Sequence, residues 1–147
     1  MATLTQSIVI DAPVKTVFDL ALDIGNVWKV KDVALVDINL EPGGVGTSAS
    51  IWSHFLGFHL AGKAVYTEVV PEQKIVIEVH FFAENPTWTF TFEPEGSGTK
   101  LTLTGEWHVG APLVGKPLET MMVKEHEPFA DEILHNLQKQ AESLATV

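Results

Sequence analysis

The chain has 147 residues, of which 46% are hydrophobic and 19% are charged, so it has ample material for the core of one globular domain. Nine basic residues against nineteen acidic ones give a net charge of −10, and all nine basic residues are lysines. An acidic chain without the bidentate guanidinium of arginine is unsuited to phosphate backbones or anionic membranes, which excludes a nucleic-acid partner. Cysteine is also absent, which excludes disulfides, thiolate metal sites and cysteine nucleophiles.

The N-terminal segment predicts one strand and two helices. Residues 3–10 alternate apolar and polar side chains, which is typical of a half-buried strand. Asp11 and Pro13 combine a good N-cap with a residue favoured in the first helical turn, so a helix should begin here. We expect it to end at the Gly-Asn pair 25–26, and a short second helix to follow through Trp28. The segment has no basic leader and only a three-residue apolar run, so we expect no signal peptide, no stable membrane insertion and a cytoplasmic location.

From Val33 onward the hydrophobic period changes to two, which predicts strands. The predicted strands cover 33–41, 47–55, 58–70, 74–82, 87–93 and 99–108. Their connections are short, so neighbouring strands should pair antiparallel as a meander. In the last two strands the large apolar side chains share one face, which we expect to point inward. These side chains are Trp88, Phe90, Phe92, Leu101, Leu103 and Trp107.

A two-residue turn at 56–57 would place His54 directly opposite His59 on one face of a hairpin. Two imidazoles in that position could share a metal ion. The other face of the hairpin is plainly more apolar, so we expect the two histidines to face outward and predict no metal site. The same register carries Glu68 to the inner face, and a bulge near Gly62 would resolve that conflict.

After the Gly-Ala-Pro segment 110–112 the period returns to 3.6 and predicts one helix over 117–144, roughly 42 Å long. Its apolar stripe consists of Met122, Phe129, Ala130, Ile133, Leu137, Ala141 and Leu144. His126 lies almost at the centre of this stripe, and Glu119 lies on the same stripe about 10 Å away. Two interpretations of His126 stay open. It is a core histidine held by one hydrogen bond to a strand, or it points into a cavity and orients a ligand carbonyl or hydroxyl.

With this order of elements the chain resembles the START-like or SRPBCC superfamily, which includes polyketide cyclase/dehydrase-like and birch-pollen-allergen-like proteins. The resemblance rests on IVIDAPVKTVFDLALD (8–23), NVW (26–28), GGVG (43–46), TEVVPEQKIVIEV (67–79) and the strand over 98–107. It covers 1–147 as a single domain. It implies the α+β helix-grip fold, in which a seven-stranded curved antiparallel sheet wraps around the long C-terminal helix. The implied order is β-α-α-β6-α, with an apolar cavity between sheet and helix.

The function that the resemblance implies is the binding of a hydrophobic small molecule, such as a lipid, polyketide or aromatic metabolite, in this cavity. The residues expected to line it are Trp28, Trp88, Phe90, Leu103, Trp107, Met122, His126, Phe129 and Ile133. The absence of arginine argues against ligands with a carboxylate or phosphate, although Lys63 could substitute. We expect no cofactor, and the choice between a monomer and a homodimer stays open.

The alternative is an enzyme of the cyclase or dehydratase type that acts on a hydrophobic substrate in the same cavity. Its acid/base candidates are His126, Glu119, Tyr66 and Glu68. A protein-interaction domain of the chaperone-activator kind, also found in the superfamily, is a third interpretation. The number of polar groups that reach the cavity separates the first two. Zero or one favours binding, whereas a hydrogen-bonded acid/base pair favours catalysis.

Overall fold

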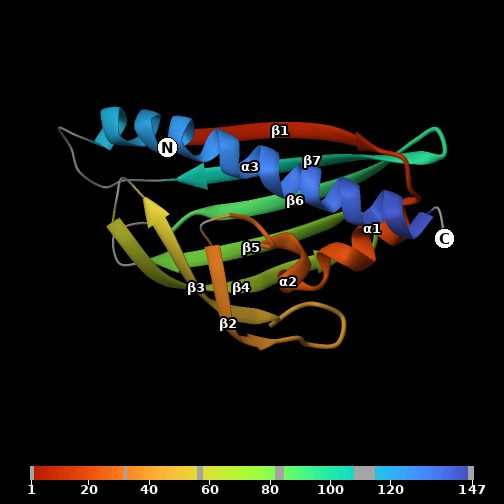
Figure 1. Ribbon diagram of the computed structural model, residues 1–147, viewed down its shortest axis with the longest axis horizontal. Coiled ribbons are helices and arrows are strands. Elements are labelled where there is room, and N and C mark those ends of the chain that lie inside the picture. Colours follow the sequence, from red (N-terminus) through yellow and green to blue (C-terminus); the bar gives the residue numbers. More distant parts are fainter. Residues whose placement is uncertain (1, 32, 56–57, 82–84, 108–114, 146–147) are drawn as a thin grey trace.

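The computed structural model describes residues 2–31, 33–55, 58–81, 85–107 and 115–145, without the side chains of 53–55, 58, 60, 115–116, 118 and 122. Ten elements follow one another in the predicted order of strand, two helices, six strands and long helix (Figure 1). They are β1 (Ala2–Ile10), α1 (Val14–Ala21), α2 (Ile24–Val27), β2 (Val33–Asn39), β3 (Ser48–Phe55), β4 (Phe58–Val70), β5 (Lys74–Phe81), β6 (Thr87–Glu95), β7 (Gly98–Trp107) and α3 (Gly115–Ala145).

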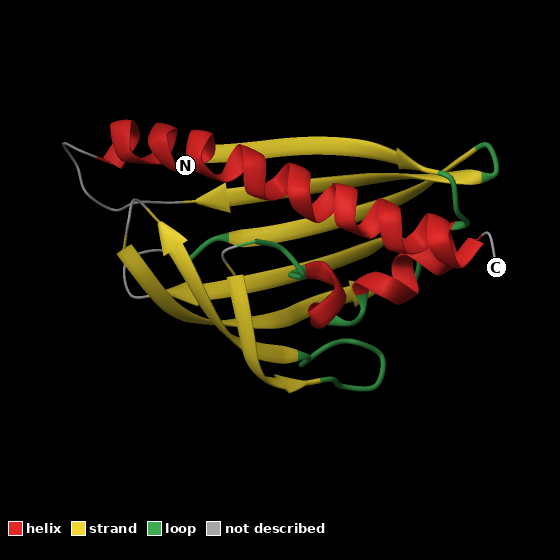
Figure 2. Cartoon of the chain, viewed as in Figure 1, coloured by secondary structure: helices red, strands yellow, loops and turns green. Residues whose placement is uncertain are grey.

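All seven strands form one antiparallel sheet in the order β1-β7-β6-β5-β4-β3-β2. The meander from β2 to β7 follows from the short connections, and β1 adds to the far edge by pairing with β7. The sheet curves, and α3 lies along β1 and across the concave face, with α1 and α2 near its C-terminal end (Figure 2). The predicted helix-grip fold is therefore confirmed.

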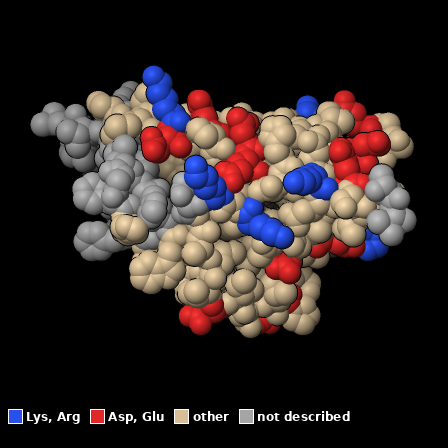
Figure 3. All heavy atoms as spheres, in the orientation of Figure 1, with Lys and Arg blue, Asp and Glu red and all other residues tan. Residues whose placement is uncertain are grey.

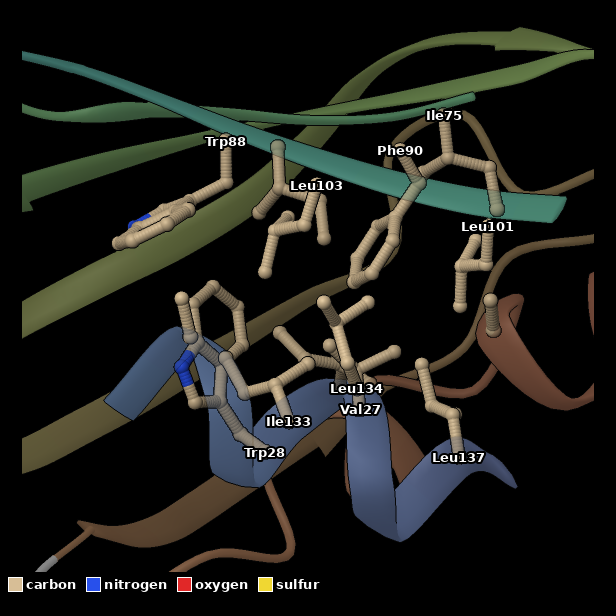
Figure 4. Close-up of a cluster of buried hydrophobic side chains, with 14 of the residues drawn as sticks. Val27, Trp28, Ile75, Trp88, Phe90, Leu101, Leu103, Ile133, Leu134 and Leu137 are labelled. Carbon is tan, nitrogen blue, oxygen red and sulfur yellow. The ribbon is translucent and has the colours of Figure 1, made fainter. Parts of the chain in front are cut away.

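The core lies between the concave face of the sheet and the three helices. Strand β6 alternates buried and half-buried residues with a period of two, as predicted for a strand with one face inward. Figure 4 shows side chains from the sheet and from α3 pointing toward one another. The buried residues that it labels are Val27, Trp28, Ile75, Trp88, Phe90, Leu101, Leu103, Ile133, Leu134 and Leu137. Full burial of one such side chain contributes roughly 1.5–3 kcal/mol, so this layer is a large source of stabilisation.

The β3–β4 hairpin has the predicted register, with His54 opposite His59. Its apolar face is the inner one, because Ala49, Ile51 and Ala64 are buried, whereas His59 is exposed. Trp52 also lies on the outer face and is 53% exposed. The orientation of the hairpin is therefore confirmed, while the side chain of His54 lies outside the described part of the structure.

A bulge in β4 was expected near Gly62, but it lies between Tyr66 and Glu68. At Gly62 the strand is regularly paired with Phe81. A Cβ there would lie 2.4 Å from the ring of Phe81 and 2.7 Å from the backbone oxygen of His80, so only glycine permits that close pairing. Past the bulge Glu68 is exposed and forms a 2.5 Å ion pair with Lys74. A bulge was therefore correctly expected, but its position was wrong: strict alternation continues to the buried Tyr66, and the extra residue then turns Glu68 outward.

The beginning of α1 also differs from the prediction. Its N-cap is Pro13, without a side-chain hydrogen bond, and Asp11 does not cap it. Instead, the backbone N–H of Asp11 donates to Glu142 of α3 at 2.9 Å, and Thr99 Oγ1 donates to the carbonyl of Ala12 at 2.7 Å. Hydrogen bonds with α3 and β7 thus fix residues 11–12, where the sequence predicted a side-chain N-cap.

The boundary between α1 and α2 lies earlier than predicted. The Gly-Asn pair 25–26 does not end α1 but lies within α2. Asp23 is the N-cap of α2, and its carboxylate accepts a 2.8 Å bond from the N–H of Gly25. A strong cap at this position begins a new helix and so ends the previous one before it.

Helix α3 covers the predicted range 117–144 and extends slightly beyond it. Pro128 lies inside the helix and has no N–H for the carbonyl four residues earlier. The buried apolar residues described on α3 all follow Pro128, and they are Ala130, Ile133, Leu134, Leu137 and Ala141. None of the helices that the structure describes is long and apolar enough to span a membrane.

Side chains on the C-terminal half of α3 bind backbone groups of other elements. Asn136 Nδ2 donates to the carbonyl of Lys29 at 2.6 Å, and Glu132 accepts from the N–H of Lys31 at 2.6 Å. Gln138 and Gln140 donate to the carbonyls of Val9 and Asn26 in the same way. This half of the helix is therefore fixed to β1, to α2 and to the segment after α2.

Candidate functional site

Five rings from four parts of the chain meet between α3 and the sheet. We call them the ring cluster: Trp28 after α2, Trp88 of β6, Trp107 of β7, and His126 and Phe129 of α3. Trp88 and Trp107 meet edge to face, with ring centroids 5.2 Å apart. The His126 ring lies 4.9 Å from Trp107 and 6.0 Å from Phe129. The edge-to-face pairs Trp88–Trp107 and His126–Phe129 contribute about 0.5–1.5 kcal/mol each beyond their burial.

Gly105 makes room for the two indole rings to meet. It pairs with Trp88 across the β6–β7 ladder and lies two residues before Trp107 on the same strand. A Cβ at this position would lie 2.7 Å from Trp88 and 2.8 Å from Trp107. A glycine inside a strand is a known sign of close approach, so the sequence contained this signal, although the sequence analysis did not use it.

The indole nitrogen of Trp107 is a buried donor. The residue is 1% exposed, and its Nε1 has no hydrogen-bond partner among the residues that the structure describes. Buried indole N–H groups normally find an acceptor. The ring cluster therefore contains a polar group whose hydrogen-bonding capacity is unused.

A groove of about 440 Å³ lies between the beginning of β1 and the N-terminal half of α3. Its lining residues are Ala2, Thr3, Glu119, Thr120, Val123, Lys124 and Glu127. Ala2 is the direct cross-strand partner of Trp107, and side chains of partners point to the same face of a sheet. The groove thus borders the ring cluster. No local sequence pattern predicts the groove, because its two walls lie more than a hundred residues apart.

The two carboxylate candidates lie in different surroundings. Glu119 is 6% exposed and lies in the wall of the groove. Glu68 is exposed on β4, where it pairs with Lys74, and it does not face the interior. Of the four acid/base candidates, only His126 lies in the ring cluster.

Tyr66 is fully buried, and its hydroxyl donates a 2.7 Å hydrogen bond to the carbonyl of Ala21 at the end of α1. Burial raises the pKa of the Tyr66 hydroxyl well above its ordinary value, and the negative charge of Asp23 raises it further. The neutral hydroxyl therefore holds α1 against β4.

The other expected lining residues divide into two groups. Phe90, Leu103 and Ile133 are buried in the layer next to the ring cluster (Figure 4). The side chain of Met122 lies outside the described part of the structure.

Positive charge stays on the surface. Lys63 is exposed on the outer face of β4, so it does not substitute for arginine in the interior as the sequence analysis allowed. Figure 3 shows lysines and acidic residues side by side on the surface of the molecule. The described lysine side chains are Lys15, Lys29, Lys31, Lys63, Lys74, Lys100, Lys124 and Lys139, and none of these eight is buried.

Within the described ranges, no three histidine or acidic side chains gather in a way that could hold a metal ion.

A family described as "Polyketide cyclase / dehydrase and lipid transport" matches residues 1–142 of the chain. No curated protein gives a significant sequence match.

Solved structures with the same fold include TTHA0849 from Thermus thermophilus, with 19% identity, a TM-score of 0.75 and 97% and 98% of the two chains covered. The Zhui aromatase/cyclase from Streptomyces sp. R1128 has 15% identity and a TM-score of 0.78 over 95% and 93% of the chains. A START superfamily protein from Mycobacterium smegmatis has 13% identity and a TM-score of 0.70 over 98% and 99%. At these identities the likeness establishes the fold alone.

Proposed function

The chain belongs to the polyketide cyclase, dehydrase and lipid-transport family, and on this premise we propose that it binds a hydrophobic small molecule between the sheet and α3. The ligand is a lipid, a polyketide or an aromatic metabolite. The observation that carries the proposal is the ring cluster, in which three indoles, a phenyl ring and one imidazole from four parts of the chain meet beside a groove. Apolar sites with a few polar groups are the usual form of small-molecule sites.

The apolar surface of the site supplies the driving force. A ligand that loses about 300 Å² of apolar surface from water gains roughly 7 kcal/mol. Part of this gain is offset by the lost translational and rotational freedom of the ligand. The net gain is therefore below about 7 kcal/mol, and we expect dissociation constants for simple apolar probes between about 10 μM and 1 mM.

Nile red, a neutral dye that fluoresces in apolar surroundings, tests the proposal. We expect saturable binding that Phe129→Ala weakens at least about fivefold, because Phe129 packs against both Trp28 and Trp88. Trp52→Ala is the matched control, since it removes an exposed ring from the outer face. Absence of saturable binding, or equal losses in the two variants while both remain folded, would contradict the proposal.

A second candidate is an enzyme of the cyclase or dehydratase type in the same site. It is favoured by His126, whose imidazole lies within the ring cluster and would face a bound substrate as a proton donor or acceptor. Organic extraction of protein purified from its own host supplies the natural ligand for the test. An enzyme converts that ligand to a product seen by mass spectrometry, and His126→Leu abolishes the conversion while apolar probes still bind. A binding protein returns the ligand unchanged.

A further inference from the structure

The unused donor of Trp107 lies in the part of the interior that the proposed site occupies. Trp107 is on the inner face of β7, and its ring centroid lies 4.9 Å from that of His126. Its cross-strand partner is Ala2, which lines the groove. No protein oxygen in the described residues accepts from its Nε1–H. An unpaired buried donor is unfavourable in the empty protein, so a ligand that brings an acceptor oxygen to it gains affinity.

The charges around the site decide what kind of oxygen this is. A buried carboxylate or phosphate needs a cation, and the chain has no arginine. The described lysine side chains remain outside the interior. Lys124 lies in the wall of the groove but is exposed there, and the carboxylates of Glu119 and Glu127 in the same wall outnumber it. A neutral acceptor, such as a ketone or quinone oxygen, gains the hydrogen bond without an uncompensated charge.

The shape of the ring cluster indicates the body of the ligand. Phe129 is stacked over Trp28 with an angle of 24° between the rings and meets Trp88 at 63°. Flat rings pack well against both orientations of aromatic neighbours, whereas a flexible acyl chain loses more conformational freedom on binding.

We propose that Trp107 Nε1–H donates a hydrogen bond to a neutral acceptor oxygen of the ligand. The ligand class is then an uncharged, flat ring ketone, and not a fatty acid or a phosphate ester. This inference rests on the proposed binding function and specifies its substrate class.

Three probes of matched shape test the inference: fluorene, which has no acceptor, 9-fluorenone, which has a neutral one, and fluorene-9-carboxylate, which is an anion. Their affinities are measured by quenching of tryptophan fluorescence. We expect 9-fluorenone to bind roughly fivefold to tenfold more tightly than fluorene, and the carboxylate to bind most weakly. If none of the three binds, the proposed function itself fails. If all three bind equally, or the carboxylate binds best, only the present inference is overturned.

The variant Trp107→Phe keeps a ring at the same position but removes the N–H. We expect the ratio of the affinities for 9-fluorenone and fluorene to fall to about 1, while fluorene still binds. Trp88→Phe is the matched control, because it removes the same volume from the same cluster, and it should lower both affinities without changing their ratio. A ratio that survives in Trp107→Phe, or disappears only in Trp88→Phe, overturns the assignment.

The wild-type protein provides a readout that does not depend on a variant. In spectra of ¹⁵N-labelled indoles, 9-fluorenone should move the Trp107 Nε1–H proton signal downfield, as a new hydrogen bond does, and fluorene should not. A downfield shift of equal size with fluorene would show that ring contact alone causes it, and would overturn the hydrogen bond.

Discussion

Tyr66 is the single tyrosine of the chain, and its surroundings determine how it titrates. Its hydroxyl lies in the core and donates to Ala21, so ionisation would bury a charge and break a hydrogen bond. Both effects favour the neutral form in the folded protein. Tyr66 is thus a packing residue whose polar end is satisfied by the end of α1.

We predict that Tyr66 stays neutral until the protein unfolds. Because its pKa is raised in the folded protein, its contribution to stability is complete below the ordinary pKa of about 10 and is lost as the pH rises above that value. Absorbance at 295 nm, which reports tyrosinate, should therefore rise only together with unfolding. Tyr66→Phe should lack this loss of stability and show no tyrosinate signal. A rise centred near pH 10 in a protein that circular dichroism shows to be folded would contradict the prediction.

At the scale of elements, the two halves of α3 differ. The part after Pro128 buries an apolar stripe and sends side chains to backbone groups of distant segments. The part before Pro128 contributes His126 to the ring cluster and most of the wall of the groove. The part after Pro128 therefore fixes the helix and also brings Phe129 to the ring cluster, whereas the part before Pro128 supplies His126 and the helical wall of the groove.

Asn136 tests the fixing half. Asn136→Ala removes the 2.6 Å bond to the carbonyl of Lys29, and the free energy of unfolding should fall by about 1 kcal/mol. Lys139→Ala, an exposed change one turn further on, should alter it by less than about 0.5 kcal/mol. Urea denaturation measures both values, and equal effects of the two changes would contradict the role of Asn136.

Local patterns predicted the elements and much of the ring cluster. The period of two placed Trp88 and Trp107 on the inner face, and the period of 3.6 placed His126 on the inner stripe of the helix, because side-chain direction follows directly from each period. The Asp11 cap was wrong because α1 begins at Val14, so Pro13 and not Asp11 occupies the N-cap position. The Asp11 N–H binds Glu142 instead, which lies far along the chain. The groove and the unpaired donor of Trp107 arise where distant elements meet, so no local pattern contains them.

At the scale of the whole molecule, the positions of the four tryptophans allow a bound ligand to be located from their indole signals. Trp28, Trp88 and Trp107 are buried in the ring cluster, whereas Trp52 lies on the outer face of the hairpin. A hydrophobic ligand bound between the sheet and α3 would lie beside the three buried indoles and far from Trp52, so it should perturb only the first group.

The most direct test is a titration of the protein, labelled with ¹⁵N at the tryptophan indoles, with Nile red. Each of the four indole N–H signals is assigned from the corresponding tryptophan-to-phenylalanine variant. We predict that the signals of Trp28, Trp88 and Trp107 shift with one common dissociation constant while the signal of Trp52 stays in place. A shift confined to Trp52, or no shift of the three buried indoles at saturating dye, would contradict the account.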